Sequence, residues 1–339
     1  MVDLRITIKD VAKLANVSIS TVSRVMNNPI AVQEEKRIRV QAAIEELNFE
    51  PNSFARGLIN NRSHTIGVLI PDILNPYYSG VIRGMEDAAK SLDYALIICN
   101  TDRDEQRTLS YLHNFRNKHI DGILYTSDFM RPSYYKEIDQ YHMPVVLVST
   151  ESKEYPLSSI MIDDEKGAFD AVTYLIALGH NNIAFLGFTL PDPITGEKRY
   201  RGFKRALREG NIYDQCKEYI AFANNWFEEA YRSVAQLMQK HPQITAIFAC
   251  SDEFAMAAIA YLHDNNLQVP KNVSVVGFDN VRMSWMVTPR LTTIAQPMYD
   301  IGYKAVLLLH NQLTNVYNSP TQIILPHELV IRESTREVR

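Results

Sequence analysis

Residues 6–28 read Ile6-Thr-Ile-Lys-Asp-Val-Ala-Lys-Leu-Ala-Asn-Val-Ser-Ile-Ser-Thr-Val-Ser-Arg-Val-Met-Asn-Asn28. The stretch fits two short helices joined by a tight turn. Thr7 can cap the first helix while Asp10 reaches back to it, a pattern that marks a helix start. The apolar residues that follow share one face at helical spacing: Ile8, Val11, Ala12 and Ala15. Asn16 then ends this helix, and the pattern predicts the first half of a helix-turn-helix.

The second helix begins after Ser18, whose hydroxyl can cap it. Val22 and Val25 form its inward face. Its outward face presents side chains that can meet base edges in DNA: Ile19, Ser20, Thr21 and Arg24. Helix pairs of this kind also occur in all-α domains, so spacing alone leaves DNA binding and plain packing both open.

Glu34 to Leu47 predicts a third, amphipathic helix. Short motifs in and around these helices agree with one family: Lys9-Asp-Val-Ala-Lys13, Val17-Ser18, Thr21-Val-Ser-Arg24, Pro51-Asn52, Ala55-Arg56 and Leu58. On these motifs the chain resembles the LacI/GalR family of transcriptional regulators, and the resemblance continues to the C-terminus. We therefore predict DNA contacts at Thr7, Ser18, Ile19, Ser20, Thr21, Arg24, Asn27, Ala55, Arg56 and Leu58. Arg24 is expected to bind a guanine through two hydrogen bonds.

Residues 51–62 are a predicted hinge between a headpiece, 1–50, and a core, 63–339. Asn52 to Ile59 could form about two helical turns, fewer than the roughly 12–15 residues that an isolated helix needs in water. The resemblance implies that two such segments fold side by side in a DNA minor groove, with Leu58 inserted between base pairs. The alternative is a plain linker whose leucine packs on the core.

The composition of the 339 residues bounds the class of protein. No apolar run approaches the roughly 18 residues of a membrane helix, and a signal peptide's apolar core is missing, so we expect a cytoplasmic protein with no membrane partner. The three cysteines lack metal-ligand spacing, which predicts reduced core thiols and no metal or other cofactor. The net charge is −4, but residues 1–62 hold nine Lys and Arg against seven Asp and Glu, so the headpiece is mildly basic.

From Thr65 onward, short β-branched runs alternate with helical segments. The predicted strands are Thr65–Ile70, Tyr94–Thr101, Asp121–Ser127, Pro144–Ser149, Ser158–Asp163, Asn182–Phe188, Glu218–Ala223, Ala246–Ser251 and Val273–Asn280. Continuous apolar strands are typical of parallel sheets that helices cover on both faces. A total of about eleven strands favours two lobes of five or six over one sheet. The predicted fold class is therefore α/β, with a helix-turn-helix headpiece and a two-lobed core of two doubly wound parallel sheets.

The resemblance adds the connectivity of the core. Similar proteins have a periplasmic-binding-protein-like core whose lobes exchange strands through three crossovers. Carried onto this chain, lobe one is about 63–164 and 297–325, and lobe two is about 165–296 and 326–339. Side chains at the carboxyl ends of parallel strands line the crevice of such sheets, which predicts a ligand site between the lobes.

The predicted ligand-binding residues are Tyr77, Tyr78, Asp163, Arg199, Trp226, Ser251 and Asp279. Arg199 stands three residues before a glycine, as the ligand-gripping arginine of similar regulators does. Asp279 ends a strand where family members bind sugar hydroxyls, and Trp226 stands where sugar-responsive members stack an aromatic ring on a pyranose.

Each of these residues also has a purely structural interpretation. Arg199 can be a surface cation among its basic neighbours, and Trp226 can be simple core packing. The alternative for Asp163 and Ser251 is that they serve solely as caps of the helices that follow them. Ser149, at the end of another strand, is a weaker candidate for the same crevice.

The C-terminal motifs narrow the subgroup. Gly277-Phe-Asp-Asn280, Gln296-Pro-Met-Tyr-Asp-Ile-Gly302 and Leu325-Pro-His327 resemble the catabolite control branch of the family. That branch docks a seryl-phosphorylated phosphocarrier protein through an arginine and a lysine, where this chain has Leu307 and Asn311. Without those cations a phosphoserine would gain little binding energy at this surface, which favours a small-molecule effector.

The sequence thus predicts a homodimeric transcriptional regulator, a repressor of carbohydrate-utilisation genes. Its predicted partners are operator double-stranded DNA and a sugar or sugar phosphate. Control by the phosphoprotein and an extracytoplasmic sugar-binding protein are the alternatives. An enzyme is disfavoured because the chain has no Gly-rich phosphate loop, nucleophile elbow or His-Glu-x-x-His pair.

Overall fold

The computed structural model describes residues 6–49, 62–189, 195–224, 227–316 and 319–338. The chain divides into two compact units, Met1–Ser63 and His64–Arg339. In the part of the chain that the structure describes, no helix combines the length and apolarity of a membrane span.

Over its described residues the first unit has three short helices, α1 (Ile8–Leu14), α2 (Ile19–Asn27) and α3 (Glu34–Glu46), with a 3₁₀ turn η1 (Pro29–Ala31). The Thr7 amide and hydroxyl both donate to Asp10 Oδ2, at 2.8 and 2.7 Å. Asn16 has a φ of +51°, the left-handed conformation that ends a helix. The Thr21 amide donates to Ser18 Oγ at 3.2 Å. Both predicted caps and the helix-turn-helix are confirmed.

The second unit contains two six-stranded sheets. The first has the order β11-β5-β4-β3-β1-β2, and the second has the order β12-β10-β9-β8-β6-β7. The bounds in the first are β1 Thr65–Ile70, β2 Ala95–Asn100, β3 Gly122–Thr126, β4 Val145–Val148, β5 Ser158–Ile162 and β11 Gln322–Leu325. Those in the second are β6 Ile183–Phe188, β7 Ile220–Ala223, β8 Ala246–Ala249, β9 Ser274–Asp279, β10 Thr292–Ala295 and β12 Glu328–Val330.

The pairings confirm the α/β class with one departure from the all-parallel expectation. Neighbouring strands run parallel, but the edge strand β12 pairs with β10 in the antiparallel direction. The strands β10, β11 and β12, of four, four and three residues, lie outside the predicted ranges. The chain passes from one sheet to the other after β5, β10 and β11, the three crossovers that the resemblance implies.

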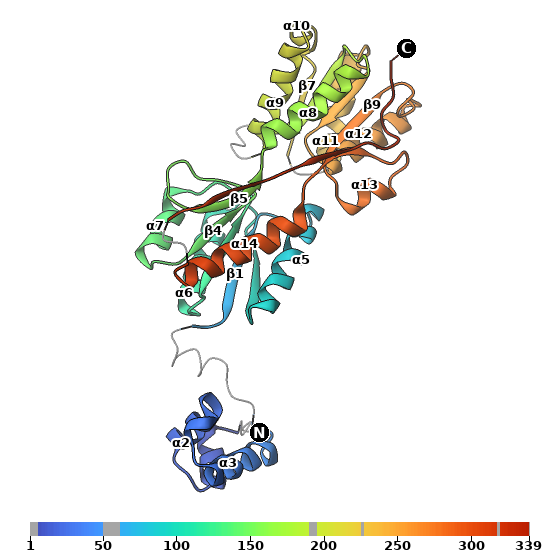
Figure 1. Cartoon of the computed structure of the whole chain (residues 1–339). Helices are drawn as coiled ribbons and strands as arrows, with labels where there is room; N and C mark the ends of the chain where they lie inside the picture. The colour runs from blue at the N-terminus through green and yellow to red at the C-terminus, as the bar shows by residue number, and fades with distance from the viewer. Residues whose placement is uncertain (1–5, 50–61, 190–194, 225–226, 317–318, 339) are drawn as a thin grey trace. The chain divides into compact units, whose positions relative to one another are not determined.

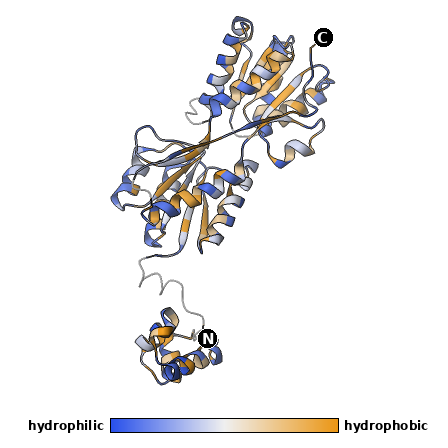
Figure 2. Ribbon diagram, in the orientation of Figure 1, coloured by the Kyte–Doolittle hydropathy of each residue, from blue (hydrophilic) through white to orange (hydrophobic). Residues whose placement is uncertain are grey.

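Helices cover both sheets (Figure 1). The first lobe consists of the first sheet with α5 (Pro76–Ser91), α6 (Glu105–Asn117), α7 (Pro132–Gln140) and α14 (Met298–Leu313). The second lobe consists of the other sheet with α8 (Asp164–Ala177), α9 (Gly196–Glu209), α10 (Tyr213–Cys216), α11 (Phe227–Lys240), α12 (Asp252–Asp264) and α13 (Arg282–Met286). Figure 2 shows that the strands are mostly hydrophobic while the helices carry hydrophilic outer faces, as a doubly wound fold requires.

Candidate functional site

A cavity that opens to solvent lies between the two lobes. It is lined by Asn75, Tyr77, Tyr78, Arg103, Ser127, Ser149, Ile162, Asp164, Phe188, Thr195, Arg199, Asp279 and Gln296. Several of these residues end a strand or directly follow one, in both sheets. The cavity therefore occupies the crevice at the carboxyl ends of the strands, where doubly wound sheets bind ligands.

Arg199 forms the floor of this cavity. It lies in the first turn of α9, and only 4% of it is exposed. Its Nε donates to Asp164 Oδ1 at 2.8 Å, its Nη2 lies 2.7 Å from the same oxygen, and its Nη1 donates to the Cys250 carbonyl at 2.5 Å. A guanidinium held at both edges in this way has a fixed orientation. Arg199 is thus a cleft residue and not a surface cation.

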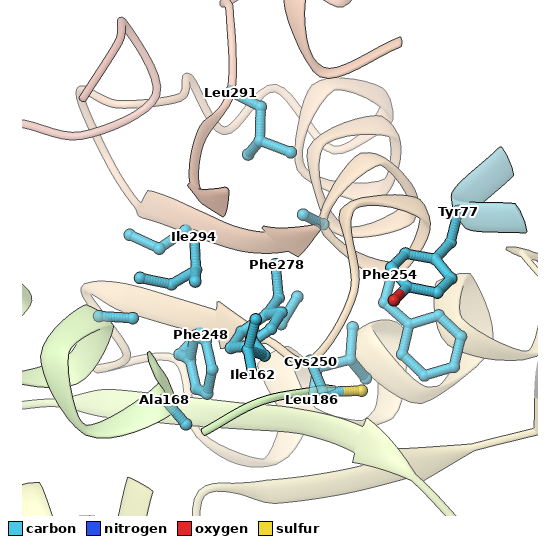
Figure 3. Packing of buried hydrophobic residues seen from close by; sticks show 14 of the residues in the cluster. Tyr77, Ile162, Ala168, Leu186, Phe248, Cys250, Phe254, Phe278, Leu291 and Ile294 are labelled. Carbon is cyan, nitrogen blue, oxygen red and sulfur yellow. The ribbon is translucent and has the colours of Figure 1, made fainter. Parts of the chain in front are cut away.

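The face of the guanidinium rests on an aromatic ring. Arg199 Cζ lies 3.6 Å from the centroid of the Phe278 ring, close enough for a cation–π contact. Figure 3 shows Phe278 packed with Phe248 and Ile294, which come from the neighbouring strands β8 and β10. The hydrophobic core of the second lobe therefore supports the charged floor of the cavity.

A chain of hydrogen bonds crosses the cavity from one lobe to the other. The Tyr77 hydroxyl lies 2.5 Å from Ser149 Oγ in the first lobe, and it donates to Gln296 Oε1 at 3.5 Å. Gln296 Nε2 then donates to Asp279 Oδ1 at 2.7 Å. Asp279 Oδ1 in turn lies 3.5 Å from Arg199 Nη1. These polar groups can exchange hydrogen bonds with a polar molecule in the cavity.

Three buried carboxyl groups surround Arg199 and the end of β9. Asp252 accepts from the Val281 amide at 2.8 Å and from the Thr293 hydroxyl at 2.5 Å. Burial raises the pKa of Asp164, Asp252 and Asp279 above the ordinary value for an aspartate. For Asp279 the pKa rises to about 6, because burial and the nearby Asp164 outweigh Arg199 and Gln296.

This raised pKa predicts a pH dependence of folding. The folded chain holds the Asp279 proton more tightly than the unfolded chain, whose aspartates titrate near 3.8. The contribution of Asp279 to stability is therefore complete below about pH 4 and falls as the pH rises to about 6. Denaturant unfolding at pH 4 and pH 7 should show a larger loss of stability with rising pH in the natural chain than in Asp279→Asn.

The control is Asp139→Asn, because Asp139 is exposed on α7 and lies outside the buried carboxyl cluster. It should leave the change in unfolding free energy between the two pH values the same as in the natural chain. Equal changes in the natural chain and in Asp279→Asn would contradict the assignment.

The structure brings four of the seven predicted ligand residues to this cavity. Tyr77, Tyr78, Arg199 and Asp279 all line it. Ser251 lines a smaller adjoining pocket that shares Asp279, and its Oγ also accepts from the Phe254 amide at 3.2 Å to cap α12. Trp226 lies outside the described residues, as do the predicted DNA contacts Ala55, Arg56 and Leu58.

Asp163 does not line the cavity. Its Oδ1 accepts from the Lys166 amide at 2.9 Å, so it caps α8 at the surface. The strand β5 already ends at Ile162, and the residue after Asp163, Asp164, begins α8 and faces the crevice. The sequence shows an Asp-Asp pair there, and only the point where the strand gives way to the helix distinguishes the two.

Sequence reasoning missed several lining residues. Ser127 ends a predicted strand, so the strand-end rule alone could have found it, whereas Gln296 follows β10, a strand that the sequence analysis did not predict. Arg103 lies in a loop where it and Asp102 both have a φ above +50°, a local conformation that no motif signals. Ser149, the weaker candidate, is a full member of the cavity wall.

The headpiece presents the predicted outward face of α2. Ile19 is 45% exposed, Ser20 and Arg24 are also exposed, and Val22 and Val25 are buried. The Ser18 hydroxyl lies 2.8 Å from Ser20 Oγ and 2.9 Å from Thr21 Oγ1. The second helix thus exposes a largely polar face, as the recognition helix of a helix-turn-helix does.

Comparisons with known proteins agree with both units. Residues 7–52 match the bacterial regulatory proteins of the lacI family, and residues 63–333 match the periplasmic binding proteins and sugar binding domain of the LacI family. Catabolite control protein A of Priestia megaterium is 38% identical over 333 residues, which cover 98% of this chain and 100% of that protein.

Two solved structures have the same fold along almost the whole chain. The Lac repressor dimer bound to operator and the anti-inducer ONPF has a TM-score of 0.87 at 26% identity, covering 98% of this chain and 99% of that one. The CelR–cellobiose complex has a TM-score of 0.75 at 26% identity, with coverages of 97% and 100%. With the matches to both units and the full-length relative, these findings show that the chain belongs to the LacI family of bacterial regulatory proteins.

Proposed function

We propose that this DNA-binding regulator is a homodimeric repressor of carbohydrate-utilisation genes, controlled by a sugar or sugar phosphate in the cavity between its lobes. The observation that carries the proposal is the fixed Arg199–Asp279 pair at the carboxyl ends of a doubly wound core, in one chain with a helix-turn-helix. One structural relative was solved with operator DNA and another with cellobiose. A regulator of this kind works where the DNA is, so we place it in the cytoplasm.

We assign roles in the cavity by chemistry. Asp279 accepts hydrogen bonds from ligand hydroxyls, and Arg199 donates to them, since a guanidinium fork suits neighbouring oxygen atoms. Tyr77 and Tyr78 cover the ligand from the first lobe. Ser251 contributes from the adjoining pocket, while a role for Asp163 or Trp226 remains a prediction.

We also propose the organisation into a headpiece, 1–50, a hinge, 51–62, and a core, 63–339. In this scheme the hinge folds when two copies meet on DNA, and Leu58 acts as the minor-groove wedge. Ligand binding then biases whether the two hinges can pair.

The homodimer is supported by an exposed apolar edge in the first lobe. The strand β2 lies at the edge of its sheet, so among the residues that the structure describes no strand pairs with its outer side. Ile98 on this strand is 39% exposed. Natural proteins usually cover such an edge, and a second copy of the chain can do so here.

Control by the phosphoprotein would require cationic side chains on α14. Leu307 and Asn311 are half-buried on this helix and offer no cation to a phosphoserine. The extracytoplasmic alternative disagrees with the headpiece, and the relatives named above are regulators and not enzymes. A small-molecule effector remains the better account.

The experiment that tests the proposal has two stages. A thermal-shift screen of sugars and sugar phosphates identifies compounds that stabilise the full chain, and each hit is then tested in operator titrations with DNA from the gene's neighbourhood. We expect at least one hit to change operator affinity. Operator affinity that responds only to a seryl-phosphorylated phosphocarrier protein would support the alternative, and no binding to any duplex would overturn the proposal.

Arg24→Ala should weaken operator binding and relax sequence preference. Loss of a bidentate contact to guanine costs on the order of 1–3 kcal/mol and affects one position of each half-site. Titration of operators mutated at single positions measures both effects. Lys36→Ala, an exposed cation on α3, is the control and should leave sequence preference unchanged. If Arg24→Ala weakened all sequences equally, Arg24 would be a phosphate contact.

A further inference from the structure

Glu151, Lys198 and Gln322 join the two lobes beside the cavity. Lys198, in the first turn of α9 in the second lobe, places its Nζ 2.7 Å from Glu151 Oε1. Glu151 belongs to the segment after β4 in the first lobe. Its other oxygen, Oε2, accepts from Gln322 Nε2 on β11 at 2.8 Å. None of the three lines the cavity or its adjoining pocket, so they are separate from the proposed ligand contacts.

The Glu151–Lys198 pair is more enclosed than an ordinary surface pair. Its side chains are 25% and 16% exposed, whereas those of Asp170 and Lys166, a pair of the same length on α8, are 31% and 57% exposed. Burial alone would raise the pKa of Glu151, but Lys198 and Gln322 outweigh it and hold the pKa below its ordinary value. The pair is therefore ionised and only partly screened by water.

In this arrangement of the lobes very little of the cavity floor meets solvent. Tyr77, Arg199 and Asp279 are only 6%, 4% and 7% exposed. A ligand can reach them only when the lobes move apart. Lys198 is the neighbour of Arg199 on the same helical turn, so opening the cavity at Arg199 also pulls Lys198 away from Glu151.

We propose that Glu151, Lys198 and Gln322 form a latch that stabilises the closed arrangement of the lobes and sets the fraction of chains that are open. The latch makes no contact with the ligand site and acts only through the open–closed equilibrium. A ligand that binds the closed form is held more weakly when that form is less populated, so the latch also tunes the response to ligand. The inference requires two lobes that move and does not depend on which ligand binds.

The test measures the separation of the lobes directly, in the full chain without ligand. Spin labels are attached at Lys136→Cys on α7 and Gln239→Cys on α11, both exposed positions, in a chain that also carries Cys99→Ser. Excess unlabelled chain suppresses signals between subunits, and double electron–electron resonance gives the distance distribution. We expect Glu151→Gln and Lys198→Met each to raise the longer-distance fraction about two- to fivefold.

Three further variants distinguish a specific contact between the lobes from a nonspecific loss of stability. Combining Glu151→Gln with Lys198→Met should open the lobes no further than either change alone, because both remove the same contact. Combining Glu151→Lys with Lys198→Glu should restore part of the closed fraction. Lys166→Met breaks the intralobe pair with Asp170 and should leave the distribution unchanged.

Two results would overturn the latch. One is a distance distribution that neither Glu151→Gln nor Lys198→Met alters. The other is an equal opening caused by Lys166→Met. Either result leaves the proposed function intact, because operator binding and ligand hits are measured separately.

Discussion

Replacing Arg199 with leucine is expected to lower the free energy of unfolding by about 3–5 kcal/mol, because removing one partner of a buried ion pair leaves an uncompensated charge. Asp164 and Asp279 would both lose their cation, and both are buried. The Cys250 carbonyl would also lose its donor. Denaturant unfolding at pH 7 measures the loss, and it should shrink at low pH, where the two carboxyl groups take up protons.

Two comparisons make this prediction specific. Arg201→Leu, on the same helix, removes an ion pair with Glu165 whose side chains are 45% and 31% exposed, and it should cost no more than about 1 kcal/mol. Combining Arg199→Leu with Asp164→Leu should recover part of the loss, since replacing both partners removes the unpaired charge. A cost for Arg199→Leu as small as that for Arg201→Leu would show that the cluster does not depend on its arginine.

The sequence predicted the fold well where its signals are local. The caps at Thr7 and Ser18 and the spacing of buried valines in α2 involve residues within one or two helical turns. The long parallel strands were also visible, because burial on both faces produces continuous apolar runs. The antiparallel edge strand β12 has three residues and no such run, so its pairing is decided by contacts far away in the chain.

The candidate site was predictable in part for the same reason. Arg199 is predicted from a motif and Asp279 from a strand end. The distance between them depends on how α8, α9 and β9 pack together, and these elements lie far apart in the sequence. Asp163 is predicted as a ligand residue because the expected strand ends there, whereas β5 ends at Ile162 and Asp164, the first residue of α8, faces the crevice. Gln296 links Tyr77 to Asp279 across the cavity, and nothing local to it indicates that role.

Gly302→Ala is the second change expected to have a large effect, a loss of about 3 kcal/mol in the free energy of unfolding from overpacking. A Cβ atom at Gly302 on α14 would lie 1.9 Å from the carbonyl oxygen of Val81 on α5. The facing Gly84 on α5 would bring a Cβ to 2.0 Å from the Tyr299 carbonyl oxygen. Backbone atoms cannot yield as a side chain can, so the two helices would have to separate. The gain of about 1 kcal/mol from better helix propensity does not offset this.

Gly80→Ala is the matched control, because the atoms nearest to a Cβ there belong to the Met298 side chain and not to the backbone, with Met298 Cβ at 3.0 Å and Sδ at 3.3 Å. At that distance the neighbour has to give by only a few tenths of an ångström, far less than at Gly302, so we expect a change below about 1 kcal/mol. Separation of α5 from α14 should also disturb the cavity, since Tyr77 begins α5 and Gln296 precedes α14. Gly302→Ala should therefore reduce the thermal shift caused by any ligand hit, while Gly80→Ala should not. Equal unfolding free energies for the two variants would mean that the helices can separate without cost.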